Sequence, residues 1–137
     1  MAIELTTANS YKILTATAEL ATSTYNLTET DSHSGRGTMN NIPKVYDINL
    51  TLGDMVINLF ALSLLFVGGS DALGFTVKGT ITAGAGNTLV LDAFTSESEV
   101  NTICGLPTAT ITGVGTAFML TPAGATNWLL LVCDSSS

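Results

Sequence analysis

Short apolar runs separated by glycine are the feature of this sequence that most restricts its fold. The runs are rich in threonine, valine and isoleucine, and the chain holds 13 glycines. β-Branched side chains fit the pleated surface of a sheet and lose rotamer freedom in a helix, so the runs favour strands. The sequence therefore predicts an all-β chain with mainly antiparallel pairing, arranged as a jelly-roll-like sandwich or a small barrel.

The clearest strand covers residues 45–52, where apolar and polar side chains alternate in strict period two. Gly53-Asp54 can form a two-residue type II′ turn, which predicts a hairpin with the run that begins at Met55. In this register three apolar residues lie on the face of the hairpin that points away from the core, namely Val56, Phe60 and Leu62. We expect that face to be covered, either by another subunit or, in a two-sheet sandwich, by a loop.

A short helix within 54–66 is the alternative to the second strand of that hairpin. Asp54 could cap such a helix, and the leucines that follow are good helix formers. Short apolar runs are compatible with either structure, so periodicity alone does not decide between them.

Further strands are expected along the rest of the chain. They cover 11–17, 19–28, 75–78, 80–82, 88–94, 108–112, 117–121 and 128–133. The last run is apolar at every position, which predicts an interior strand with both faces buried. No repeat of solenoid length stands out and no linker divides the chain, so residues 1–137 are expected to form a single domain.

Charged side chains are scarce, at 11% of the residues, and only four of them are Lys or Arg. The formal net charge of −7 opposes binding to nucleic acid, because that affinity is built largely from Lys and Arg. The single histidine lies in Asp31-Ser32-His33-Ser34, four consecutive residues that would mostly point apart instead of converging as a catalytic triad does. We therefore expect no enzymatic activity, no metal and no cofactor.

The longest apolar stretch, 55–67, is shorter than the roughly 18 residues that a membrane-spanning helix needs. The first seven residues lack the basic and apolar regions of a secretory signal, so we expect synthesis in a cytoplasm and no membrane partner. Cys104 and Cys133 are expected to be two buried thiols, because free cysteine is among the most buried residue types.

The polar stretch 29–44 is long for a loop in a compact domain, and such loops are often functional. It contains Arg36, Met39 and Ile42, which we expect to contact a partner. A surface loop without such a contact is the alternative.

Two C-terminal segments resemble sequences of bacteriophage virion proteins. One is the Thr/Gly/Ala-rich run from Gly79 to Leu91, and the other is Gly124-x-x-Asn127-Trp128-Leu129-Leu130-Leu131. Similar segments are common in phage head decoration proteins and in fibre modules.

The resemblance implies a capsid decoration, or cement, protein on the outer surface of the virion, commonly a homotrimer, that clamps neighbouring subunits of the major capsid protein. It also implies that residues 1–13 form an N-terminal arm that adds a strand to a neighbouring sheet edge. The apolar contact residues of this arm would be Ile3, Leu5, Tyr11 and Ile13. A head or tail fibre module that binds a receptor or glycan is the alternative function.

Overall fold

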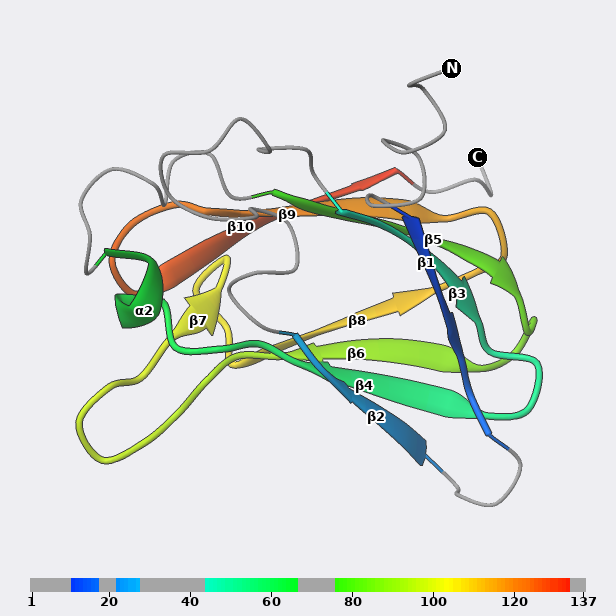
Figure 1. Ribbon diagram of the computed structural model, residues 1–137, viewed down its shortest axis with the longest axis horizontal. Coiled ribbons are helices and arrows are strands. Elements are labelled where there is room, and N and C mark those ends of the chain that lie inside the picture. Colours follow the sequence, from blue (N-terminus) through cyan, green and yellow to red (C-terminus); the bar gives the residue numbers. More distant parts are fainter. Residues whose placement is uncertain (1–10, 18–21, 28–43, 67–75, 134–137) are drawn as a thin grey trace.

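The computed structural model describes residues 11–17, 22–27, 44–66 and 76–133, and Figure 1 shows their arrangement. In this part of the chain ten strands form two sheets. The strands are β1 (Tyr11–Thr15), β2 (Thr22–Asn26), β3 (Lys44–Asn49), β4 (Asp54–Asn58), β5 (Val77–Ala83), β6 (Thr88–Asp92), β7 (Thr102–Ile103), β8 (Thr108–Thr112), β9 (Ala117–Pro122) and β10 (Asn127–Cys133). A short helix, α2 (Ser63–Phe66), follows β4, and no helix in the described ranges has the length and apolarity to cross a membrane.

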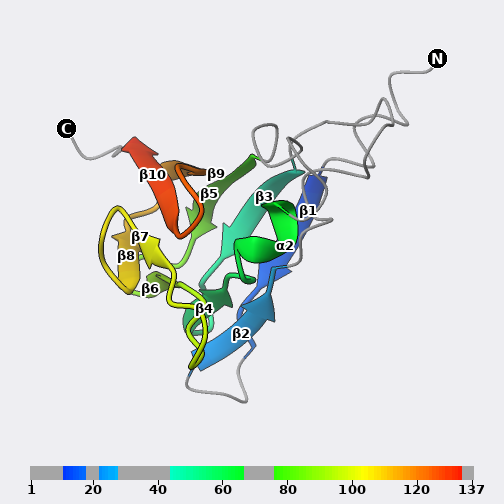
Figure 2. The same ribbon diagram turned by 90° about the vertical axis from the view of Figure 1, so that its left-hand side faces the viewer.

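The first six strands form a parallel coil that alternates between the two sheets. β1, β3 and β5 are parallel neighbours in one sheet, and β2, β4 and β6 are parallel neighbours in the other. The first turn of the coil is thus β1 with β2, the second is β3 with β4, and the third is β5 with β6 (Figures 1 and 2). Tyr11 pairs with Val45 and Val45 pairs with Lys78, so successive turns are offset by 34 and 33 residues. The strand positions repeat, but the residue identities do not, so this repeat could not be predicted from the sequence.

Antiparallel strands follow the third turn and extend both sheets. β9 pairs with β5, β10 pairs with β9, and β8 pairs with β6. The two-residue strand β7 pairs in parallel with the start of β10. One sheet therefore has the order β1-β3-β5-β9-β10-β7 and the other has the order β2-β4-β6-β8.

The all-β prediction is confirmed, but the prediction of mainly antiparallel pairing is not. Of the eight strand pairs between described strands, five are parallel, namely the four within the coil and the pair of β7 with β10. A jelly roll, which is built from antiparallel Greek keys, is not confirmed either.

The predicted hairpin between 45–52 and the run from Met55 is wrong, because β3 and β4 lie in different sheets. The chain turns after β3, where Gly53 N–H donates to Leu50 O at 3.2 Å, and then enters the opposite sheet. Ile48 and Ile57 are both buried, but they reach the core from opposite sides. Alternation fits either arrangement, because it requires only that alternate side chains point into the same core.

The core lies between the two sheets. Its largest fully buried side chains include Trp128, Tyr46, Ile48, Leu50, Leu62, Ile81, Leu89 and Leu91. Trp128 and Phe60 pack edge to face, with ring centroids 5.4 Å apart and planes at 81°. Such an aromatic pair contributes about 0.5–1.5 kcal/mol beyond the area that it buries.

The alternative of a short helix within 54–66 is confirmed only for Ser63–Phe66. Asp54 does not cap it, because this residue begins β4 and accepts a hydrogen bond from Thr88 N–H at 2.8 Å. The start of α2 is held instead by a distant loop, in which Asn101 Oδ1 accepts a hydrogen bond from Leu62 N–H at 2.8 Å.

Candidate interaction surface

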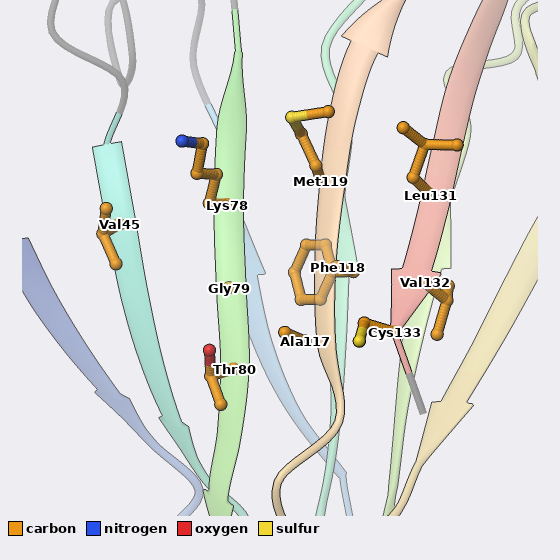
Figure 3. A pocket seen from close by; sticks show the side chains of 10 residues that line it. All are labelled: Val45, Lys78, Gly79, Thr80, Ala117, Phe118, Met119, Leu131, Val132 and Cys133. Atoms are coloured by element: carbon orange, nitrogen blue, oxygen red, sulfur yellow. The ribbon is translucent and has the colours of Figure 1, made fainter. Parts of the chain in front are cut away.

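The outward side chains of four neighbouring strands form a largely apolar row across the six-stranded sheet. Val45 on β3 pairs with Lys78 on β5, which pairs with Met119 on β9. Met119 in turn pairs with Leu131 on β10. Figure 3 shows these four side chains beside one another on adjacent strands.

This row lines a shallow groove of about 370 Å³, which we call the β10 groove. A second row, formed by Thr80, Ala117 and Cys133 in register, continues the same surface. Lys78 is the one charged residue among the residues that line the groove. The lining therefore favours an apolar partner surface with, at most, one acidic group opposite the lysine.

β10 contributes the most exposed apolar side chains of this surface. On the outer face Leu131 is 49% exposed and Leu129, two residues earlier, is 38% exposed. Val132, which is 50% exposed, alternates with them and lies on the same side of the strand as Trp128. The prediction that both faces of 128–133 are buried is therefore wrong. Trp128 is fully buried on the inner face, where the ring of Phe60 packs against it, whereas the outward Leu129 and Leu131 are exposed.

Beyond β7, the edge of β10 has no strand partner among the described residues. β7 pairs only with Asn127 and Trp128, and Cys104 N–H donates to Trp128 O at 2.8 Å on that side. Further along, Leu130 N–H contacts Cys104 Sγ at 3.3 Å. Backbone groups alternate in direction along a strand, so the N–H and C=O of Val132 also point toward this edge. A long apolar edge strand is where a sheet pairs most readily with another chain.

Both cysteines are free and exposed, so the prediction of two buried thiols is wrong. Cys104 lies in the tight turn after β7 and adopts a positive φ of 51°. Cys133 ends β10 at an outward position in the β10 groove.

A cluster of hydrogen-bonded polar side chains around Glu99 lies apart from the groove. Its carboxylate accepts hydrogen bonds from Ser63 Oγ at 2.7 Å, from Ser63 N–H at 3.1 Å and from Asn101 Nδ2 at 2.9 Å. The hydrogen bond from the Ser63 hydroxyl is the main cause that lowers the pKa of Glu99, and desolvation opposes it. All of these donors stabilise the charged carboxylate, so the cluster attaches α2 to the 95–101 loop.

Metal-binding groups do not converge in the described ranges, where no three His, Cys, Asp or Glu side chains are close enough to hold an ion. Asp31-Ser32-His33-Ser34 lies outside these ranges.

The structure separates the residues that the sequence assigned to a partner interface. Ile13 lies on β1 with 59% of its side chain exposed, and Val56 is half-buried on β4. Phe60 and Leu62 were assigned to an interface because we expected them on an outward face, but both are buried in the core. The backbone of Tyr11 belongs to β1, but its side chain lies outside the description. The remaining predicted contacts also lie outside the described residues: Ile3, Leu5, Arg36, Met39 and Ile42.

The last part of the proposed N-terminal arm is not free, because residues 11–13 pair with β3 in the chain's own sheet. Conversely, the residues of the β10 groove were not predicted as contacts. Their only signal in the sequence was the unbroken apolar run 128–133, which has the same appearance in an interior strand and in an exposed one.

Comparisons of this chain with protein-family models, with curated proteins and with solved structures found no match.

Proposed function

We propose that this chain is a structural virion protein that decorates the outer surface of a phage capsid. It stabilises the shell by binding neighbouring subunits of the major capsid protein, and it acts without catalysis. A ligand that binds only the assembled shell stabilises that shell by mass action. Such a clamp needs apolar contact area and backbone pairing more than it needs ionisable groups.

The observation that supports this proposal best is the β10 groove beside its open strand edge. A strand from a capsid subunit could extend the sheet at Val132 while its side chains cover Leu129 and Leu131. Main-chain pairing then provides affinity, and the apolar row provides specificity. The ammonium group of Lys78 would form an ion pair with one carboxylate of the partner.

A fibre module is the second candidate, and the parallel coil favours it. Stacked turns of similar length extend along one axis, which suits a rod. Recognition of a glycan by aromatic stacking has less support, because every aromatic side chain of known exposure in the described ranges is buried or half-buried: Tyr25, Tyr46, Phe60, Phe94, Phe118 and Trp128.

Quantitative mass spectrometry of gradient-purified particles of the virus that encodes this chain tests the proposal. The number of copies is measured relative to the major capsid protein. A near-stoichiometric ratio is expected for a decoration protein. A few copies per particle would favour the fibre module, and absence from the particle would overturn both.

A further inference from the structure

The first turn of the coil ends in two strand edges that lie next to each other and that no other described strand pairs with. β1 is the last strand of the six-stranded sheet, and β2 is the last strand of the four-stranded sheet at the same end. Figure 2 shows both strands on the same side of the molecule. Between them lies a cleft of about 280 Å³ that is lined by residues of both strands and by Met55.

The hydrogen bonds at the ends of these strands show which backbone groups face outward. Ala16 N–H donates to Asn49 O at 2.9 Å, so by alternation the N–H and C=O of Ile13 and Thr15 point away from β3. Leu27 N–H donates to Asn58 O at 2.9 Å, so those of Thr22 and Thr24 point away from β4. Both edges therefore present donors and acceptors to a further strand.

The opposite end of the coil is closed by this chain itself. β9 pairs with β5 and β8 pairs with β6, so the third turn has neighbours in both sheets. Stacked coils need such a cover on both terminal turns. Within the described ranges, the first turn has none.

We infer that the first turn pairs with the first turn of a second copy of this chain. A single extended peptide could pair with β1 or with β2, but it would leave the other edge open. An occupant of both edges must carry two strands with the spacing of the two sheets. A second copy, related by a two-fold axis, has this spacing by construction.

The charge of Lys12 selects how the two copies pair. Lys12 Nζ lies 3.4 Å from Tyr25 Oη and 5.0 Å from the centroid of that ring, so the ammonium group lies between β1 and β2. Pairing β1 with the partner's β1 would place two lysines on adjacent strands of one sheet, where like charges repel. Pairing β1 with the partner's β2 places them in opposite sheets, whose backbones are about 10 Å apart, so the two lysines no longer lie on adjacent strands. It also brings the exposed Ile13 beside β-branched Thr22 or Thr24, which is a favourable cross-strand pair.

This arrangement is a dimer closed by a two-fold axis, and it differs from the homotrimer that the resemblance implies. It leaves the β10 groove uninvolved and does not depend on the virion role. The two proposals can therefore fail separately.

Sedimentation equilibrium of the full chain over a concentration series tests the inference, with proline variants on two edges. Thr24→Pro removes an outward N–H of β2 and should weaken dimerisation at least tenfold. Thr110→Pro is the matched control, because Thr110 is an exposed threonine of β8, the opposite edge of the same sheet. Ala93 N–H donates to Pro107 O at 3.0 Å, so by alternation the N–H of Thr110 also points outward. The control should dimerise as the wild type does.

Hydrogen exchange of the wild-type chain gives a second measurement that needs no variant. The amides of Ile13, Thr15, Thr22 and Thr24 should become protected as the concentration rises, whereas that of Thr110 should not. A monomer at the highest concentration, a trimer, an equal effect of both proline variants, or protection confined to β10 would each overturn the inference.

Discussion

At the residue scale, two glycines in and after β5 permit close approaches that no other residue allows. A Cβ on Gly79 would lie 2.5 Å from the ring of Phe118. Gly84 has φ 101°, and a Cβ there would clash with the backbone carbonyl group of Leu50. The second contact joins the chain reversal between β5 and β6, in the third turn, to the chain reversal after β3, in the second turn. Gly84 therefore permits two turns of the coil to stack at this corner.

Substitution of Gly84 by alanine tests this close approach. Gly84→Ala should lower the free energy of unfolding by at least about 2 kcal/mol, because left-handed strain of roughly 1–3 kcal/mol adds to a clash with backbone. Gly86→Ala is the control, since Gly86 has φ 92° and no atom within 4 Å of the added Cβ. Urea unfolding measures both variants. Equal losses would show that the contact with Leu50 has no effect.

The Glu99 cluster predicts a dependence of stability on pH. The folded state lowers the pKa of Glu99 below its ordinary value of 4.5 through the hydrogen bond from Ser63 Oγ. The stabilisation is therefore complete above pH 4.5 and is lost as the pH falls through the lower pKa of the folded state.

Glu99→Gln should remove roughly 1 kcal/mol of stability at pH 7 and much less at pH 3, because hydrogen bonds to a partly exposed charge are discounted by solvent. Urea midpoints at the two pH values measure the difference. Glu97→Gln, at an exposed acid two residues away, is the control. The same loss at both pH values would contradict the role of the charge.

At the element scale, β10 has two different faces. Its inner face contributes Trp128 to the core, and its outer face carries the exposed Leu129 and contributes Leu131 to the β10 groove. The sequence predicts the strand and its place near the C-terminus, because a continuous run of six apolar residues has the length and composition of a strand. Exposure of the outer face was not predictable, since it depends on which element covers the sheet.

A charge in the β10 groove should separate binding from folding. Leu131→Asp should reduce occupancy on capsids at least tenfold, while the free energy of unfolding changes by less than about 1 kcal/mol at this half-exposed strand position. Occupancy is measured by adding the purified protein to particles that lack it.

Leu106→Asp is the matched control, because Leu106 is 62% exposed and lies outside the groove. Equal occupancy of the two variants would remove the groove from the proposed function.

At the scale of the whole molecule, the coil makes the fold depend on strand pairs that are distant in the sequence. Neighbouring turns are offset by 33 or 34 residues in the six-stranded sheet. The chain must lose the entropy of closing these long loops before most of the stabilising contacts form. Folding should therefore be slow for a chain of this size.

The chain's single tryptophan is suited to measure this rate. Trp128 is fully buried against Phe60, so its emission should shift to longer wavelength on unfolding. Stopped-flow refolding should take roughly milliseconds to seconds, as in other all-β domains. Phe60→Leu should change the native emission and confirm the probe. Refolding in microseconds would contradict the distant pairing.

The sequence by itself determined where most of the strands lie, although it did not predict the two-residue strand β7. The expected strand 108–112 coincides with β8, and 117–121 lies within β9. The expected runs 75–78 and 80–82 form one strand in the structure, because Gly79 continues β5 beneath the Phe118 ring. Period-two alternation and β-branched composition are local properties, so they can be read without knowledge of the fold.

The tertiary structure alone decided which strands pair and which apolar faces stay exposed. The alternation in 45–58 fits a hairpin and a coil equally well. The hairpin is excluded only by the tertiary structure, in which β3 pairs with β5 in one sheet and β4 pairs with β6 in the other. In the same way, the apolar run 128–133 fits an interior strand and an exposed one. Pairing within the coil depends on contacts between residues more than 30 positions apart, and no local pattern in the sequence encodes them.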